Sequence, residues 1–187
     1  MSDKTLYNES SIESLSPLEF TRLRPGVYAG DTTYSTQLLV EIFSNAVDEF
    51  RLGHGSEIDV IIDKDNVITL RDYGQGFIPN SYRDDGKTIL EAAFSVLNTS
   101  GKYREDGTYE GTSLGSFGIG SKITNYLSHW LDVTTYRDGS YERVFFREGV
   151  FENRTSCASN SPSGTVVAWL PSEEFFKNVE VNIKEVK

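Results

Sequence analysis

The stretches EIFSNAVDE at residues 41–49 and DYGQGFIP at residues 72–79 decide the fold of this chain. In the first stretch, polar side chains recur at helical spacing, so a helix gathers on one face Glu41, Asn45, Asp48 and Glu49. The opposite side is largely apolar and is expected to dock the helix through Leu39, Phe43, Ala46, Val47 and Phe50. The second stretch ends an apolar run with an acid and two glycines, which allow the backbone to come close to a ligand. Together the two stretches predict a nucleotide site.

Length and composition point to one globular domain. The chain has 187 residues, of which 37% are hydrophobic and 25% charged, enough for one well-packed core and little for two. Residues 1–14 lack periodicity and predict a flexible N-terminal arm, followed by a single domain at residues 15–187. The net charge of −10 opposes binding to a phosphodiester backbone, so the chain is not expected to clamp DNA by itself.

The cysteine content and the N-terminus indicate a cytoplasmic protein. Cys157 is the single cysteine, which excludes an internal disulfide, fits a reducing compartment and is expected to serve packing. Residues 1–14 are polar and acidic rather than a signal peptide. No apolar run approaches the roughly 20 residues that a membrane span needs, so no membrane partner is expected.

The order of predicted elements gives the fold class. A helix begins at Ser16, where SPLE combines an N-cap serine, a proline at the first helical position and a glutamate three residues after the cap. Further helices are predicted at residues 36–52, 88–97 and 121–128. A hairpin is predicted at 57–63 and 67–71, and a meander of strands at 130–136, 141–147, 150–153 and 165–170. This order predicts an α/β (α+β) two-layer sandwich, with helices on one face of a mostly antiparallel mixed sheet.

A glycine-rich segment separates two of the predicted helices. Residues 99–120 hold six glycines and no regular pattern, and irregular segments of that length are usually functional. The last part, GSFGIG at residues 115–120, leads into a helix where Lys122 adds a cation, an arrangement that favours phosphate. A plain flexible turn is the competing interpretation. The spacing matches neither a P-loop nor the dinucleotide fingerprint.

Six ordered motifs resemble the N-terminal ATPase domain of type IIA topoisomerase B subunits, the gyrase B and topoisomerase IV B kinds. They are RPGVYAG at 24–30, EIFSNAVDE at 41–49, DYGQGFIP at 72–79, NTSGKY at 98–103, GSFGIG at 115–120 with NYLS at 125–128, and SGT at 163–165. The resemblance covers about residues 16–172. It implies the GHKL (Bergerat) ATP-binding fold, with ATP and Mg²⁺ as cofactors.

The resemblance also implies roles for individual residues. Glu41 would be the general base that activates water against the γ-phosphate, and Asn45 would offer an amide oxygen to Mg²⁺. Asp72 would accept the exocyclic amine of adenine and share a water with Thr165, while Asp48 would support the adenine-side hydrogen-bond network. The other implied ATP-binding positions are Gly76, Ile78, Lys102, Tyr109, Gly115, Ser116, Phe117, Gly118, Ile119, Gly120 and Lys122. A solvated helix face is the alternative interpretation of the acidic helix and of Lys122.

The pocket mouth departs from the usual pattern. Gln75 stands where gyrase B subunits usually have an arginine, which removes an ion pair to Glu49 and leaves coumarin-type inhibitor binding open. Pro79 would wall the pocket together with Ile78, and Arg137 resembles the second arginine of the family at this mouth. Phe117 replaces a common histidine or asparagine of the lid.

The resemblance implies an ATP-hydrolysing domain that drives gate closure for DNA strand passage. Its partners in such an enzyme are a second B subunit, the A subunit and DNA. Transducer and TOPRIM domains are absent from the 187 residues, so we expect the chain alone to be monomeric and to hydrolyse ATP slowly. Two alternatives stay open: another GHKL ATPase, such as a MutL-like, Hsp90-like or histidine kinase protein, and a non-catalytic nucleotide-binding decoy module. The intact Glu41 favours catalysis over the decoy.

Overall fold

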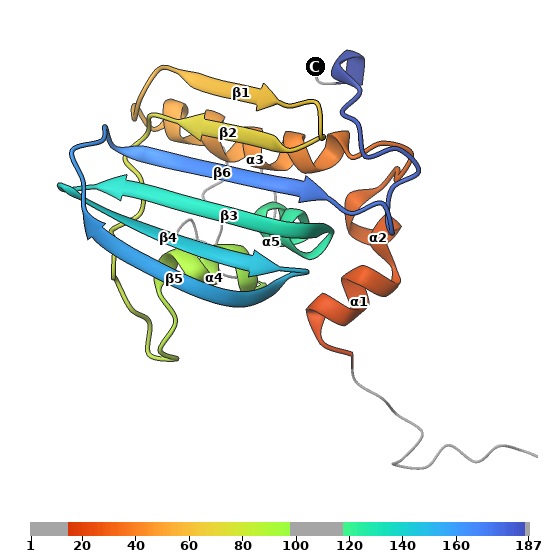
Figure 1. Ribbon diagram of the computed structural model, residues 1–187, viewed down its shortest axis with the longest axis horizontal. Coiled ribbons are helices and arrows are strands. Elements are labelled where there is room, and N and C mark those ends of the chain that lie inside the picture. The colour runs from red at the N-terminus through yellow and green to blue at the C-terminus, as the bar shows by residue number, and fades with distance from the viewer. Residues whose placement is uncertain (1–14, 98–117, 186–187) are drawn as a thin grey trace, which may run out of the picture.

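A single six-stranded sheet forms one layer of the molecule. The computed structural model describes residues 15–97 and 118–185, which excludes the predicted arm and most of the glycine-rich segment. The strands are β1 (Ile58–Ile62), β2 (Ile68–Asp72), β3 (Ser128–Arg137), β4 (Ser140–Arg147), β5 (Val150–Ala158) and β6 (Gly164–Pro171). Their order across the sheet is β1-β2-β6-β3-β4-β5, as Figure 1 shows.

Every pair of neighbouring strands is antiparallel. The predicted hairpin and meander are therefore confirmed. The expected mixed character is wrong for the strands in the described part of the chain, where the parallel pairing is an isolated bridge between Tyr34 and Asn178. Strand β5 also runs five residues further than predicted, to Ala158, because it pairs along the whole of β4.

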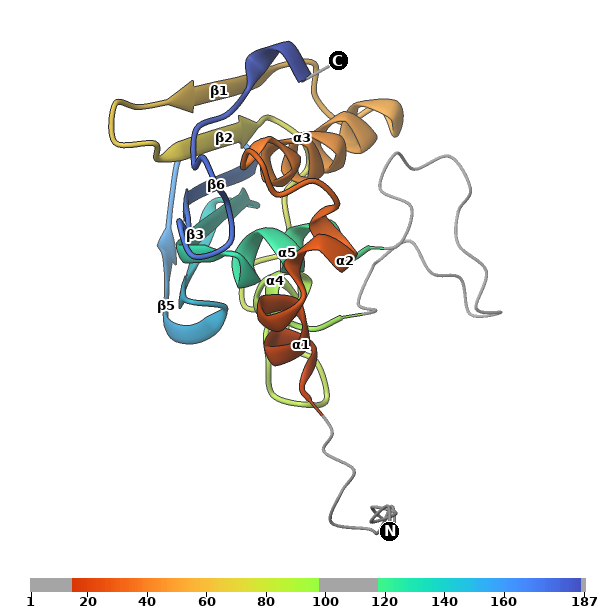
Figure 2. The same ribbon diagram turned by 90° about the vertical axis from the view of Figure 1, so that its right-hand side faces the viewer.

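The helices cover one face of this sheet, which confirms the two-layer sandwich (Figure 2). They are α1 (Pro17–Leu23), α2 (Pro25–Ala29), α3 (Thr36–Arg51), α4 (Ile89–Ser95) and α5 (Gly120–Tyr126), with a 3-10 helix η2 at Ile183–Glu185. The predicted start of α1 is confirmed: the Ser16 hydroxyl accepts from the Glu19 N–H, and Glu19 accepts from the Ser16 N–H. Helix α2 was not predicted. Pro25 ends α1 and, having no N–H to satisfy, begins the next helix.

Helix α3 packs on the sheet through a stripe that overlaps the predicted one only in part, at Leu39 and Ala46. The core between α3 and the sheet contains Leu38, Leu39, Ile42 and Ala46, packed against strand residues such as Ile68, Leu70, Val133, Val167 and Trp169. Phe43, Val47 and Phe50 are only half-buried. The reason is that α5 also contacts α3, with the Thr124 hydroxyl 3.3 Å from the Leu38 carbonyl. The buried stripe therefore adjoins the polar stripe instead of opposing it.

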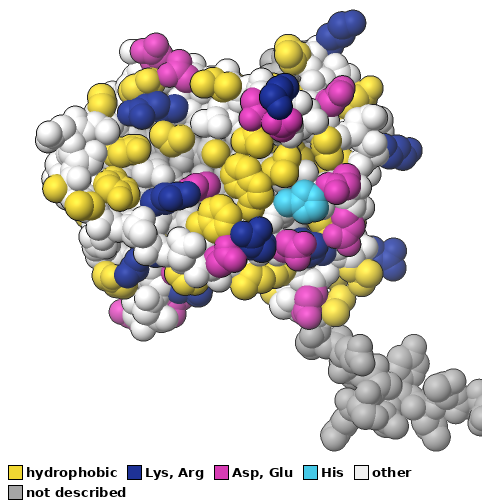
Figure 3. Space-filling view, in the orientation of Figure 1, with side chains coloured by type: hydrophobic (Ala, Val, Ile, Leu, Met, Phe, Trp, Pro, Cys, Tyr) yellow, Lys and Arg dark blue, Asp and Glu magenta, His cyan; other side chains and the backbone are white. Residues whose placement is uncertain are grey.

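The other face of the sheet turns toward the viewer in Figure 1, away from the described helices. Figure 3 shows hydrophobic side chains gathered in its middle, with basic and acidic side chains among them. Trp130 stacks on Phe145 at 6.3 Å between ring centroids, and the Arg71 guanidinium lies 4.6 Å from the centre of the Tyr73 ring. Cys157 is exposed on the edge strand β5, so its predicted packing role is wrong.

None of the helices in the described ranges has the length and apolar character needed to cross a membrane.

Candidate functional site

Asp72 lies buried at the end of β2, beside the start of β6. Its Oδ1 accepts hydrogen bonds from the Gly74 N–H at 2.9 Å and from the Thr165 N–H at 3.2 Å. Thr165 is the direct partner of Asp72 across the β2–β6 pair. No residue in the described ranges donates to Oδ2, which leaves that oxygen available to a ligand. Asp72 and Thr165, predicted to work together, are therefore brought together by the sheet.

Burial raises the pKa of the Asp72 carboxyl, and the nearby charge of Glu49 raises it further. The two backbone N–H groups and Arg71 oppose the shift. The residue is only 7% exposed. A carboxylate in such a site is poorly hydrated, so a ligand donor that reaches it replaces little water.

The glycines at 74 and 76 are required by the protein itself. A Cβ on Gly74 would lie 2.9 Å from Asp72 Oδ1 and 3.2 Å from the Glu49 Cβ. Gly76 has a φ of +68°, and its Cβ would lie 2.6 Å from the Tyr136 carbonyl oxygen. The prediction explained these glycines only by the approach of a ligand. Protein atoms already occupy the positions that a Cβ would take, so the fold itself also requires glycine here. The two glycines close a tight turn against α3 and β3.

The predicted pocket-mouth residues surround this turn. Arg137 Nη1 donates to Gln75 Oε1 at 3.3 Å and to the Gly76 carbonyl at 3.1 Å. Glu49 Oε2 lies 3.3 Å from His54 Nδ1, a neighbour that the sequence analysis missed. The turn after α3 produces this contact, because the His54 N–H donates to the Glu49 carbonyl at 2.9 Å.

The two residues predicted to wall the adenine pocket differ in exposure: Ile78 is 52% exposed, whereas Pro79 is half-buried.

Glu41 lies at the other end of the polar stripe, against the start of α5. Gln37 donates to Glu41 Oε1 at 2.6 Å. A Cβ on Gly120 would overlap the other carboxylate oxygen and lie 2.8 Å from its carbon, so only glycine permits this contact. Glu41 and Glu49 are eight residues apart on one helix, about 12 Å along its axis. The stripe therefore joins the Asp72 turn to the start of α5.

The rest of the stripe contains one exposed and one buried side chain. Asn45, one turn after Glu41, is exposed, whereas Asp48 is 3% exposed and lies 4.0 Å from Arg51 Nη1. The amide oxygen of Asn45 suits Mg²⁺, a hard cation that uses few protein ligands. The described residues contain no cluster of three or more metal-binding side chains.

Lys122 is buried at the start of α5 and is only 3% exposed. Its Nζ donates to the Gly118 carbonyl at 2.5 Å, and burial lowers the pKa of the ammonium to about 8. The alternative of a solvated lysine is therefore wrong. Ile119, Gly120 and Ser121 lie between Gly118 and this lysine. The described end of the glycine-rich segment contacts α3 through Gly120 and contacts Lys122 through Gly118. The remaining predicted residues fall outside the described ranges: Lys102, Tyr109, Gly115, Ser116 and Phe117.

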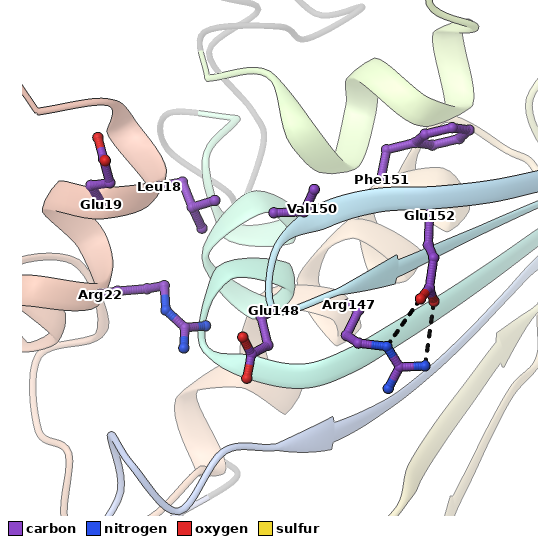
Figure 4. A pocket seen from close by; sticks show the side chains of 8 residues that line it. All are labelled: Leu18, Glu19, Arg22, Arg147, Glu148, Val150, Phe151 and Glu152. Carbon is purple, nitrogen blue, oxygen red and sulfur yellow. Dashed lines mark hydrogen bonds and ion pairs between the residues drawn. The ribbon is translucent and has the colours of Figure 1, made fainter.

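A separate pocket of about 380 Å³ lies between α1 and the β4–β5 turn (Figure 4). It is lined by Leu18, Glu19, Arg22, Arg147, Glu148, Val150, Phe151 and Glu152. None of these is a predicted site residue. Its arginines are already paired, Arg147 with Glu152 at 3.1 Å and Arg22 with Glu174 at 2.9 Å.

The chain is similar in sequence to the B subunits of DNA topoisomerase 4. It is 38% identical over 186 residues to the B subunit from Mycoplasma capricolum subsp. capricolum, which covers 97% of this chain and 28% of that protein. It is 38% identical over 181 residues to the one from Staphylococcus aureus strain Mu50, which covers 95% and 27%. The chain thus spans little more than a quarter of these relatives' length. No family model matches it.

The fold is similar to a solved topoisomerase domain. The ATP-binding domain of topoisomerase IV from Francisella tularensis, in complex with a small-molecule inhibitor, superimposes with a TM-score of 0.76 at 24% identity. The match covers 91% of this chain and 80% of that one. The predicted GHKL fold class is confirmed. The sequence is similar over almost its whole length to topoisomerase IV B subunits, and the fold is that of a topoisomerase IV ATP-binding domain.

Proposed function

We propose that this chain is the ATP-binding and ATP-hydrolysing domain of a type II DNA topoisomerase B subunit. The observation that carries the proposal is Asp72, whose Oδ1 is held by two backbone N–H groups while no described residue donates to Oδ2. The exocyclic amine of adenine is a donor that matches this acceptor, whereas guanine has a carbonyl at the equivalent position. Thr165, the partner of Asp72 on β6, and Gly76, which packs against Tyr136, would complete the base site, with Ile78 as its outer wall.

The residues proposed to carry out hydrolysis lie toward the other end of α3, near Glu41. Glu41, oriented by Gln37, is proposed to accept a proton from the attacking water. Asn45 is proposed as the protein ligand of Mg²⁺, which when bound would offset charge on the phosphates. Lys122 is a buried cation whose Nζ donates to the Gly118 carbonyl. It is proposed to contact a phosphate bound at this end of the glycine-rich segment. Gly115, Ser116, Phe117, Lys102 and Tyr109 are proposed to cover the phosphates.

The proposal also extends to a longer enzyme that would contain this domain. ATP binding would close a gate during DNA strand passage, with a second B subunit, the A subunit and DNA as partners in the cytoplasm. The relatives on which this rests are B subunits of DNA topoisomerase 4, and the chain spans 28% of the first. The net charge of −10 supports the view that DNA contacts would come mainly from other parts of such an enzyme.

The experiment that tests catalysis compares the chain with Glu41→Ala. ATP hydrolysis is measured with protein in excess over ATP, so that slow turnover is detectable, and nucleotide affinity is measured by calorimetry. We expect binding to persist and hydrolysis to fall by about 10²-fold or more, the range of general base catalysis. The exposed Glu57→Ala is the matched control and should keep the normal rate. Equal rates in the wild type and Glu41→Ala would favour the second candidate, a non-catalytic nucleotide-binding module.

A further inference from the structure

Glu142 is a completely buried acid on β4. It is 0% exposed, as are Val144 and Phe146, which follow on the same face of the strand. Removing a carboxyl group from water is unfavourable unless the group makes hydrogen bonds or pairs with a charge. An apolar residue would fill this position as its neighbours do. The retained acid therefore calls for a role in the fold or the site.

The polar contact that Glu142 makes is with a backbone group of the segment after the glycine turn. Its Oε2 accepts a hydrogen bond from the Asn80 N–H at 2.7 Å. Its Oε1 is buried and has no hydrogen-bond partner among the described residues. Asn80 has a φ of +55°, in the left-handed region that residues other than glycine seldom adopt. Glu142 thus holds a backbone amide in an unusual conformation.

Thr135 repeats this arrangement one strand away. It lies directly opposite Glu142 in the β3–β4 pair and is also 0% exposed. Its hydroxyl accepts a hydrogen bond from the Phe77 N–H at 2.7 Å. Two side chains on the same face of the sheet therefore anchor the amides of one short segment, residues 77–80.

That segment contains Ile78 and Pro79, which adjoin Gly76. Ile78 is 52% exposed, so packing in the core does little to fix it. The hydrogen bonds to the Phe77 and Asn80 N–H groups hold the segment at its two ends.

We propose that Glu142 is a positioning residue of the nucleotide pocket, holding residues 77–80 against the sheet and so fixing the Ile78 and Pro79 wall beside adenine. The inference rests on the proposed function for the pocket, although the anchor itself does not. The carboxyl group serves here because its Oε2 accepts the hydrogen bond from the Asn80 N–H. A glutamine in its place keeps an acceptor oxygen at nearly the same position.

The anchor is tested first without nucleotide. Hydrogen exchange of the Asn80 amide is measured by NMR in the wild type, Glu142→Gln, Glu142→Met and the control Val144→Ala, which removes buried volume from the same strand and face. We expect exchange at Asn80 to be roughly tenfold faster in Glu142→Met, close to wild type in Glu142→Gln and unchanged in the control. Wild-type exchange in Glu142→Met would overturn the proposal.

The role in the pocket is tested with a non-hydrolysable ATP analogue. Affinity should fall about tenfold in Glu142→Met and recover in Glu142→Gln. The melting temperature of Glu142→Met should hold or rise, since an apolar residue removes a buried carboxyl group with one unpaired oxygen. In Val144→Ala the melting temperature should fall at normal affinity. Normal affinity in Glu142→Met would overturn the positioning role. A wild type that binds no nucleotide would refute the proposed function, while the exchange data would still decide the anchor.

Discussion

Gly120→Ala tests whether the contact between α5 and Glu41 positions the proposed base. An added Cβ would overlap one Glu41 oxygen and lie 2.8 Å from the carboxyl carbon, where ordinary contact begins at 3.4 Å. The carboxyl carbon must therefore retreat by 0.6 Å, the difference between these distances, and the oxygen by more. Two of the clashing atoms lie at the end of a flexible side chain, but the third is the Glu41 Cβ at 2.9 Å, so α5 must also move slightly away from α3.

A shift of about 1 Å in a catalytic group can reduce the rate on the order of 10²-fold. We therefore expect Gly120→Ala to hydrolyse ATP about 100-fold more slowly than the wild type in a single-turnover assay with excess protein. Affinity for a non-hydrolysable analogue should change much less, because Asp72 and its turn lie at the far end of α3. The loss should appear in the chemical step and not in binding.

Gly26→Ala is the matched control for this experiment. Gly26 lies in α2, where an added Cβ meets nothing within 4 Å, so the variant should keep the normal rate. A helical alanine should also raise stability slightly, by up to about 1 kcal/mol. Unchanged hydrolysis in Gly120→Ala would refute the reasoning, and so would an equal loss in both variants.

Three other changes test the site by different measurements. Asp72→Asn should weaken analogue binding about tenfold or more in calorimetry. Burial raises the pKa of Asp72 above its ordinary 3.8, so the stability of the wild type falls as pH rises through the folded pKa. The charged form therefore costs stability at neutral pH. The melting temperature of Asp72→Asn at pH 7 should accordingly equal or exceed that of the wild type. Burial lowers the pKa of Lys122 to about 8, so urea titrations should show stability rising between about pH 8 and 10.5. Affinity for the ATP analogue should fall above about pH 8, because the cation is lost. Lys122→Met should remove both trends. Gly76→Ala combines a left-handed φ with a 2.6 Å clash, so it should lose about 2 kcal/mol and lower the melting temperature by roughly 5 °C in calorimetric scans.

Local signals predicted most of the elements, because they are written in neighbouring residues. The capping box at Ser16, the period of α3 and the acid that ends β2 each depend on a short stretch of sequence. The rotation of α3 was predicted only in part because it also depends on α5, about 80 residues further along the chain. No spacing rule contains that contact.

Glu142 shows a second limit of local patterns. In the run from Tyr141 to Arg147 charged and apolar residues alternate imperfectly, and an acid in a strand is ordinarily expected to face water. The strand register places Glu142 on the covered face with Val144. Its partner, the Asn80 N–H, is 62 residues away, so only the assembled sheet shows it.

The hydrogen bond from Thr165 to Asp72 joins residues that are 93 positions apart. Strand β2 is complete early in synthesis, yet its central partner β6 emerges near the end of the described chain. Pairings of such long range close slowly and late in folding. A growing chain would therefore acquire its base site only after almost all of the sheet has been made. Nucleotide added during refolding should accumulate on fully assembled molecules and leave earlier intermediates unaffected.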